Sequence, residues 1–133
     1  MTIDYLQLNR VTVADHYPLP LIKECIEVLS GPMWFTICDV SQSFHAVKIH
    51  PDDREKTAFV TRMGQWQFRS LPMGCRNSPS AFSGLMQLVL RGLTYSICCC
   101  FNDDVAIIEK KTFEEHLANV QTVLDRLRTA NIF

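Results

Sequence analysis

The chain has 133 residues, of which 47% are hydrophobic and 20% are charged, and its formal net charge is −1. This size allows one domain with a hydrophobic core, and the composition is that of an ordinary globular protein. The near-neutral charge argues against tight autonomous binding to nucleic acid. No apolar stretch is long enough to predict a membrane-spanning helix, and the N-terminus carries no signal-peptide pattern.

The first part of the chain predicts one helix followed by two strands. Residues 1–17 are expected to be irregular or extended. Apolar residues then recur at three- and four-residue intervals from Leu21 to Leu29, which predicts a helix that Gly31-Pro32 ends. Two strands and a polar turn are predicted next, over residues 33–40, 44–49 and 51–55.

The rest of the chain predicts two hairpins, each followed by a helix. Ser78 is the expected cap of the first helix, with Pro79 at the first helical position, and the spacing from Thr112 to Glu115 is that of a capping box. Because strands and helices do not alternate strictly, we predict an α+β fold, with an antiparallel sheet packed on helices. The predicted spans are 57–62 and 65–70 for the first hairpin, 71–77 for a loop, 78–92 for a helix, 95–108 for the second hairpin and 112–127 for the last helix.

Six cysteines are present, and three of them, residues 98–100, are consecutive. Consecutive strand residues point to opposite faces, so these three cannot join one tetrahedral zinc site, and no paired CxxC spacing occurs. We expect these cysteines to act as small buried hydrophobic residues, in a protein of an intracellular, reducing compartment.

Two adjacent acids, Asp103 and Asp104, interrupt the apolar run of the second hairpin. A tight turn at Asn102-Asp103 explains them, because Asn and Asp tolerate positive φ and bond their own backbone. A metal site is the alternative, because Asp39 ends another apolar stretch and lies beside the hairpin tip if the two segments are neighbouring strands. Three convergent carboxylates would repel one another, and Mg²⁺ would relieve that repulsion. The acids alone leave both explanations open.

Six motifs occur in one order along the chain, in residues 3–9, 17–20, 35–40, 56–59, 71–79 and 101–104. Together they resemble the reverse transcriptases of long-terminal-repeat retrotransposons and retroviruses, in particular the gypsy-type elements. The corresponding family patterns are V-D-Y-R-x-L-N, Y-P-L-P, the strand with the first metal-binding Asp, K-T-A-F, M-P-F-G-L-x-N-A-P and Y-x-D-D. Each motif is weak by itself, whereas six in order across a short chain are very specific.

The resemblance implies a polymerase palm with part of the fingers, in a single partial domain over residues 1–133. It implies RNA-directed DNA polymerase activity, in which a primer 3′-hydroxyl attacks a deoxynucleoside triphosphate with the help of two Mg²⁺ ions, or Mn²⁺ in their place. Asp39 and Asp103 would then be metal ligands, with Asp104 as a supporting acid. The backbone carbonyl of Val40 would also reach a metal.

The resemblance also implies a nucleotide pocket lined by Val40, Ser43, Phe44, Met73 and Gly74. The ring of Phe44 would exclude a ribose 2′-hydroxyl, whereas the residues alone favour a core phenylalanine there and an ordinary packed loop at Met73. Five basic side chains could contact template or primer phosphates, as the resemblance implies. The default expectation for such residues is that they are solvated on the surface. They are Lys48, Lys56, Arg62, Arg69 and Arg76.

The sequence departs from the family pattern at four positions. Leu6 replaces the usual Arg, Ala46 replaces the Gln of gypsy-type elements, and Asn102 replaces an apolar residue. Phe101 replaces Tyr, a milder change that keeps the ring and loses the hydroxyl. The thumb, connection and ribonuclease H regions and the triphosphate-gripping residues of the fingers are also expected to be absent. We therefore expect the isolated chain to be inactive or weakly active, with template-primer and deoxynucleotides as its partners and no membrane.

Two other functions compete with an active polymerase. The first is a degenerate or co-opted retroelement fragment that serves as a nucleic-acid-binding or protein-interaction module. The second is another two-metal phosphoryl-transfer enzyme such as a nuclease, which the ordered motifs disfavour. A polymerase would be expected in a cytoplasmic retroelement particle or in the nucleus.

Overall fold

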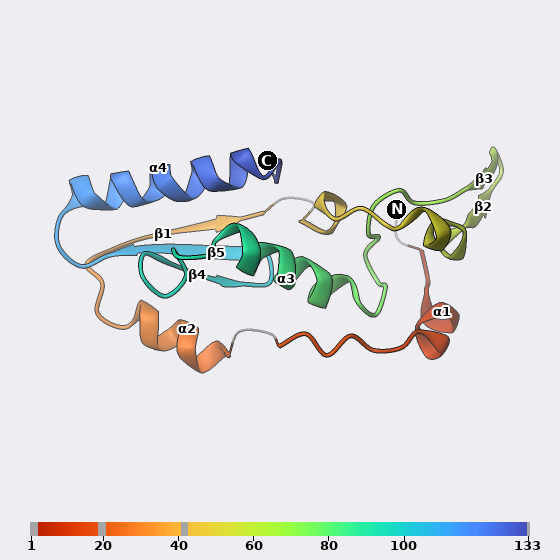
Figure 1. Cartoon of the computed structure of the whole chain (residues 1–133), viewed down its shortest axis with the longest axis horizontal. Helices are drawn as coiled ribbons and strands as arrows, with labels where there is room; N and C mark the ends of the chain where they lie inside the picture. Colours follow the sequence, from red (N-terminus) through yellow and green to blue (C-terminus); the bar gives the residue numbers. More distant parts are fainter. Residues whose placement is uncertain (1–2, 19–20, 41–42, 133) are drawn as a thin grey trace.

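The computed structural model describes residues 3–18, 21–40 and 43–132, without the side chain of Ser43. Among these residues, no helix combines the length and the apolar content needed to cross a membrane. The elements are shown in Figure 1. They are α1 (Leu6–Val11), α2 (Ile22–Leu29), β1 (Trp34–Asp39), η1 (Ser43–Ala46), η2 (Pro51–Thr57), β2 (Phe59–Thr61), β3 (Gly64–Trp66), α3 (Ser78–Val89), β4 (Cys98–Phe101), β5 (Asp104–Glu109) and α4 (Phe113–Thr129), where η denotes a 3₁₀ helix.

A three-stranded antiparallel sheet with the order β1-β5-β4 packs against the helices α2, α3 and α4 (Figure 1). The central strand β5 is formed by apolar residues that suit a pleated, buried surface. In its register, Asp104 of β5 is opposite Asp39 of β1, and Ile107 of β5 is opposite Cys98 of β4. The predicted α+β fold with antiparallel strands is confirmed.

Helices α3 and α4 cover one face of this sheet and enclose the main hydrophobic core. Val105 and Ile107 point to this face, because alternate strand residues share a face, and neither has exposed surface. Complete burial of one such side chain contributes roughly 1.5–3 kcal/mol, so both residues stabilise the packing of the helices on this face. The buried core residues are Val40, Phe82, Met86, Leu90, Cys98, Val105, Ile107, Val123, Leu127 and Ile132.

Helix α2 covers only part of the opposite face. Cys25 of α2 packs against Cys99 and Ala106 in a second, smaller cluster. Phe35 and Ile37 of β1 share this face by register, yet 63% and 62% of their surfaces are exposed. The β4 side of the face is therefore covered, whereas the β1 side is open to solvent.

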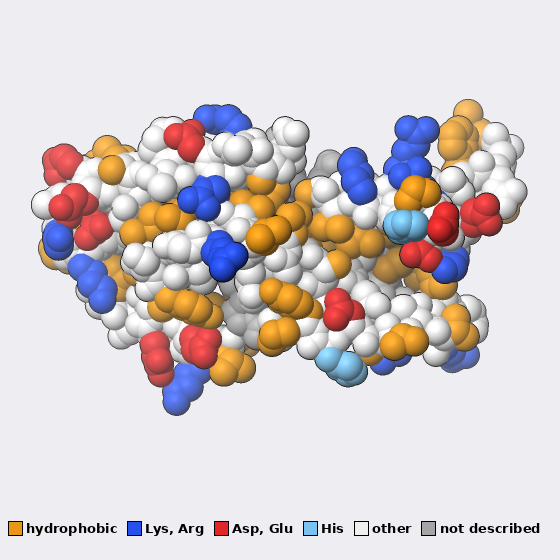
Figure 2. All heavy atoms as spheres, in the orientation of Figure 1, with side chains coloured by type: hydrophobic (Ala, Val, Ile, Leu, Met, Phe, Trp, Pro, Cys, Tyr) orange, Lys and Arg blue, Asp and Glu red, His pale blue; other side chains and the backbone are white. Residues whose placement is uncertain are grey.

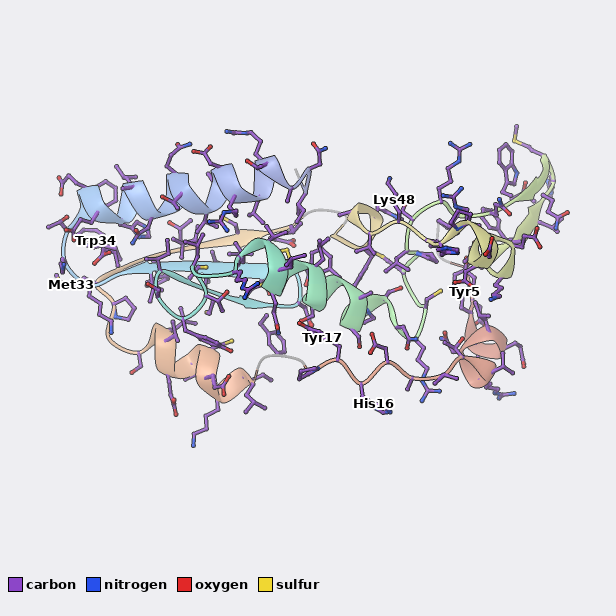
Figure 3. All side chains as sticks on the ribbon, viewed as in Figure 1. Tyr5, His16, Tyr17, Met33, Trp34 and Lys48 are labelled. Atoms are coloured by element: carbon purple, nitrogen blue, oxygen red, sulfur yellow. The ribbon has the colours of Figure 1, made fainter. Side chains whose placement is uncertain are left out.

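The prediction of an irregular or extended N-terminal segment is wrong for residues 6–11, which form the helix α1. The carboxylate of Asp4 accepts a hydrogen bond from the Leu6 backbone N–H at 2.8 Å, so the helix begins with a local side-chain partner. Tyr5 is 6% exposed and donates its hydroxyl hydrogen bond to the Thr57 carbonyl at 3.1 Å (Figure 3). That long-range contact fixes the segment, and the local pattern carries no sign of it.

The predicted strand over residues 44–49 is also wrong. The 3₁₀ helix η1 occupies the start of this segment, and Lys48 forms only an isolated antiparallel bridge with Ser70. Phe44 turns toward α3, where its ring packs edge-on to Phe82 with the centroids 5.9 Å apart. Packing of one aromatic ring thus overrides the apolar alternation that predicted a strand.

The remaining local predictions are largely confirmed. The expected hairpin over residues 57–70 is present, but its strands are shorter and end at Trp66, and the expected polar turn is the longer 3₁₀ helix η2. Thr112 caps α4, since its hydroxyl accepts from the Glu115 N–H at 3.2 Å. Ser78 is not the cap of α3, because its hydroxyl instead donates to the Pro72 carbonyl at 3.0 Å and closes the preceding loop.

The core on the α3–α4 face makes a stability prediction. Leu127→Ala, at a position with no exposed surface, should lower the free energy of unfolding by about 2–5 kcal/mol in urea denaturation. Leu117→Ala on the same helix, at a position 52% exposed, is the matched control and should change it by less than about 0.5 kcal/mol. Equal losses from both substitutions would contradict this assignment of the core.

Candidate functional site

The hairpin between β4 and β5 is closed by a two-residue turn, Asn102-Asp103. Phe101 and Asp104 are the paired residues on either side of this turn. Asn102 has φ 54°, in the left-handed region that Asn tolerates better than most residues. The Cys100 thiol donates to the Asn102 carbonyl at 3.4 Å. The predicted hairpin turn is therefore confirmed.

Strand β1 brings a third acid to the same end of the sheet. Asp39 is the direct partner of Asp104 in the β1–β5 register, and directly opposed residues have Cβ atoms about 4.5–5.5 Å apart on one face. The next residue, Val40, donates its backbone N–H to the Asp103 carbonyl at 2.9 Å. The chain segments that carry the three acids are therefore neighbours, although 64 positions separate Asp39 from Asp103 in the sequence.

The three carboxylates face solvent without a counter-ion among the described residues. Asp39 and Asp104 are exposed and Asp103 is half-buried. Of the three salt bridges in the described part of the chain, none involves these acids. Nor do any three His, Cys, Asp or Glu side chains in that part gather closely enough to hold a metal ion. The backbone thus brings the acids to one end of the sheet, whereas their three side chains do not form a group that could hold a metal ion.

The chemistry of this donor set fits a hard divalent cation. Carboxylate and carbonyl oxygens are the ligands that Mg²⁺ prefers, and adjacent strands supply both here. Burial raises the pKa of the neighbouring Cys100 thiol to about 12, with Cys98, Cys99, Cys25 and Asp103 adding to the shift. A protonated thiol is a poor metal ligand, so the oxygens are the donors that matter at this end of the sheet.

The expected nucleotide-pocket residues lie on two separate segments. Phe44 is half-buried on η1, and Val40 is 2% exposed with its side chain in the core. Met73 is 54% exposed in the loop before α3, and Gly74 has φ 90°, so a side chain there would be strained. Backbone atoms of Ser43 lie in η1, but its side chain is outside the described residues. Val40 is the chain neighbour of Asp39 and donates its backbone N–H to the Asp103 carbonyl. In the described part of the chain, no hydrogen bond joins Phe44, Met73 or Gly74 to the acids.

The sequence did not reveal a network that joins α1 to the loop before α3. The side-chain amide of Asn9 donates to the Gly74 carbonyl at 2.8 Å, and its oxygen accepts from the Arg76 N–H at 2.8 Å. The side-chain amide of Asn77 likewise donates to the Val13 carbonyl, and its oxygen accepts from the Asp15 N–H. The Arg76 guanidinium donates to two backbone carbonyls, those of Asn9 and Thr12, at 3.3 Å each. Arg76 therefore has a structural role, where the sequence allowed a phosphate contact.

A cavity of about 590 Å³ lies between this network and η2. Apolar residues such as Val47, Ile49 and Pro72 line part of it, and Lys48 and Lys56 line its polar part. Lys56 is already paired with Asp53. The residues that line this cavity come from three distant segments, 8–13, 47–57 and 71–81, so no sequence motif predicted it.

Comparison with known proteins shows the family of the chain. The family model described as "Reverse transcriptase (RNA-dependent DNA polymerase)" matches residues 1–133. The chain therefore belongs to the reverse transcriptase family, and the resemblance found in its sequence is confirmed.

The similar curated proteins are polyproteins of transposons. The chain is 35% identical over 132 residues to the retrovirus-related Pol polyproteins from the transposons 297 and gypsy of Drosophila melanogaster, and these matches cover 99% of the chain. It is 30% identical over the same length to the transposon Tf2-3 polyprotein of Schizosaccharomyces pombe. The matched region is 12%, 13% and 10% of the lengths of those proteins, respectively, so the chain spans about a tenth of each.

The positive φ of Asn102 makes a prediction about the turn. Asn102→Ala should lower the free energy of unfolding by about 1 kcal/mol, because a Cβ-bearing apolar residue is unfavourable in the left-handed region. Asn102→Gly should leave it nearly unchanged, since Gly accepts this conformation. Urea denaturation of the three proteins measures the difference, and an alanine variant as stable as the glycine variant would contradict it.

The buried thiols make a prediction about pH. Burial raises the pKa of Cys98 to about 12 from an ordinary value of 9.0, with Cys99 adding to the shift. Above pH 9 the unfolded chain loses this proton while the folded chain keeps it. The free energy of unfolding should therefore fall as the pH rises from 9 toward 12.

The matched variant for this pH dependence is Cys98→Ala. Between pH 9 and pH 11 the free energy of unfolding of this variant should fall less steeply than that of the unmodified chain, by up to about 1.4 kcal/mol per pH unit. Chemical denaturation at several pH values under reducing conditions measures both slopes. Parallel slopes would show that Cys98 does not titrate in this way.

Proposed function

We propose that this chain is the catalytic core of an RNA-directed DNA polymerase, in which Asp39 and Asp103 bind two Mg²⁺ ions. The observation that supports this function is the pairing of Asp39 with Asp104 next to the hydrogen bond from the Val40 N–H to the Asp103 carbonyl. Family membership gives the reaction class. Asp39 comes from β1 and Asp103 from the turn that leads into the neighbouring strand β5, and metals roughly 3.5–4 Å apart require shared ligands that are close in this way.

The residues of the chain have distinct parts in this proposal. Asp39 and Asp103 hold the metals, the carbonyl of Val40 is a further ligand, and Asp104 supports the site as a nearby negative charge. When bound, the two ions would lower the pKa of the primer 3′-hydroxyl and take charge from the leaving pyrophosphate, and Mn²⁺ could replace Mg²⁺. Because Asp39 and Asp104 are exposed on the open side of the sheet, substrate can reach them.

The proposed nucleotide-binding residues position the deoxynucleoside triphosphate. Phe44 is held by its edge-on contact with Phe82, so its ring would present a fixed surface to the sugar and exclude a 2′-hydroxyl. Ser43, Met73 and Gly74 would line the rest of the pocket. Since Met73 is exposed and lies on another segment, the nucleotide would contact both segments.

In this proposal the sheet β1-β5-β4 with α3 and α4 is the palm, and the elements α1, η2, β2 and β3 are part of the fingers. The matched region is about a tenth of the length of the relatives, whose printed names describe whole polyproteins. A template-primer duplex needs more positive surface than a net charge of −1 supplies. We therefore propose that the isolated chain is inactive or weak and needs further polymerase subdomains.

One observation favours a second candidate, a non-catalytic retroelement fragment that binds nucleic acid or protein. The carboxylates of the described residues do not gather into a group that could hold a metal. If the side chains keep this arrangement in the presence of metal, the chain has the fold of the family without a working metal site. Metal binding separates the two candidates.

The polymerase proposal predicts a saturable site for Mn²⁺ or Mg²⁺ in isothermal titration of the chain. Asp39→Asn and Asp103→Asn should each weaken binding by about tenfold or more, because each removes a charged oxygen ligand. Asp52→Asn is the matched control, since Asp52 is an exposed acid on η2 outside the site, and it should bind as the unmodified chain does. Binding that is absent, or that survives Asp103→Asn, would favour the non-catalytic fragment.

Primer extension tests the reaction itself. A polypeptide that carries this chain with its natural flanking segments should extend a primer on an RNA template with Mg²⁺, and Asp103→Asn should abolish extension. Folding of the variant is checked by its unfolding curve. A folded polypeptide that binds template-primer and Mg²⁺ without any extension would contradict the assignment of polymerase activity.

A further inference from the structure

The hairpin β2–β3 projects from the body of the molecule and exposes large apolar side chains near its tip (Figure 1, Figure 2). Val60 is 79% exposed, Met63 88% and Trp66 53%. Two of its residues, Phe59 and Trp66, are directly opposed in the register and therefore share a face. A hairpin of two three-residue strands cannot bury such side chains by itself, so this exposure suggests a binding role.

One face of the hairpin forms an open concavity of about 500 Å³. It is lined by Phe59, Thr61, Arg62, Met63 and Trp66. The lining thus combines two aromatic rings, a flexible thioether and one guanidinium group. Flat, polarisable groups of this kind are suited to contact a planar ring, and the arginine can meet a negative charge beside it.

The indole of Trp66 is held in place before any ligand binds. Its Nε1–H donates to the Thr61 hydroxyl at 3.2 Å. The same hydroxyl donates to the Gly64 carbonyl and accepts from the Met63 N–H, both at 3.2 Å. Since the ring is fixed by its polar edge, its face remains available, and little conformational entropy is lost when a second ring stacks on it.

An aromatic row continues from the hairpin toward η1. The rings of Phe59 and Phe68 have centroids 5.4 Å apart, and Phe68 stacks on His45 at 6.4 Å with an interplanar angle of 7°. His45 is the neighbour of Phe44 in η1. The row therefore links the exposed hairpin to the segment that carries a proposed nucleotide-binding residue.

The charge of this segment differs from that of the whole chain. Residues 57–77 contain three arginines, Arg62, Arg69 and Arg76, and no acidic residue, so their formal charge is +3 against −1 for the chain. Positive side chains lie beside the hydrophobic tip in the space-filling view (Figure 2). Alternating aromatic and basic residues are typical of surfaces that bind single-stranded nucleic acid, where bases stack and phosphates meet cations.

We propose that the β2–β3 hairpin is a stacking platform for an unpaired base of single-stranded nucleic acid, with Trp66 under the base and Arg62 at the adjacent phosphate. The proposal rests on the proposed function for its choice of a nucleic-acid partner. A second copy of the chain fits less well, because joining two of these hairpins would bring their arginines together without an acid in either segment.

The test uses a short oligodeoxythymidine and an abasic oligomer of the same length and charge, both in the presence of a chelator. Binding is followed by tryptophan fluorescence in the Trp34→Phe background, where Trp66 is the remaining tryptophan. Trp34 lies at the far end of the sheet from the hairpin, against Phe113 (Figure 3). We expect the thymidine oligomer to quench the fluorescence and the abasic oligomer to bind more weakly by roughly five- to a hundredfold.

Variants of the hairpin separate stacking from charge. Trp66→Ala, followed by fluorescence anisotropy of a labelled oligomer, should lose the preference for bases, whereas Trp66→Phe should keep part of it. Arg62→Gln should reduce the salt dependence of binding while the preference for bases stays. Val60→Ala is the matched control, because Val60 lies on the same hairpin and is 79% exposed but is not among the residues that line the concavity, and it should bind as the unmodified chain does.

Three results would overturn the platform. They are equal binding of the two oligomers, unchanged binding by a folded Trp66→Ala variant, and a concentration-dependent dimer in sedimentation that Trp66→Ala abolishes while no oligomer binds. The last result would assign the surface to a second copy. Because the assay contains a chelator, its failure is independent of the metal site, and loss of metal binding at Asp103 leaves this result untouched.

Discussion

The pairing of β1 with β5 is the constraint on which the candidate site depends. Side chains alternate between the faces of a strand, so a shift of one residue would move Asp39 to the face opposite Asp104. The register is fixed from the other side of the sheet, where Val105 and Ile107 have no exposed surface. Burial of these two side chains against α3 and α4 therefore decides where the acids stand.

The unequal covering of the two sheet faces explains why the acids are accessible. The face with Val105 and Ile107 lies under two helices, whereas α2 reaches only the β4 side of the other face. Asp39 and Asp104 lie on this second face, in line with the exposed Ile37. Charged groups that are kept in water avoid the large cost of burial, so the fold can carry uncompensated acids at this end of its sheet.

The acids and the segment 57–77 differ in charge, and this difference gives the two proposals a common physical basis. The acids at the end of the sheet suit cations, while residues 57–77 carry only positive charge. Hydrogen bonds from Asn9 and Asn77 join the N-terminal segment to the loop before α3, and so hold the N-terminal segment to the positively charged segment. In the two proposals, a nucleic acid bound across both regions would meet its metals at the acids and its phosphate partners at the hairpin.

The sequence by itself determined the local elements and the family. Helical spacing predicted α2, α3 and α4, the capping pattern at Thr112 predicted the start of α4, and the motif around Asp103 predicted its turn, because each signal is contained in a few neighbouring residues. The predictions from the sequence were wrong at residues 6–11 and 44–49. The contact of Tyr5 with Thr57 and that of Phe44 with Phe82 join distant segments, which local patterns do not reveal. Only the tertiary structure decided which residue of β5 faces Asp39, and that the three acids do not gather into a metal-holding group among the described residues, because register and side-chain exposure depend on the packing of the whole sheet.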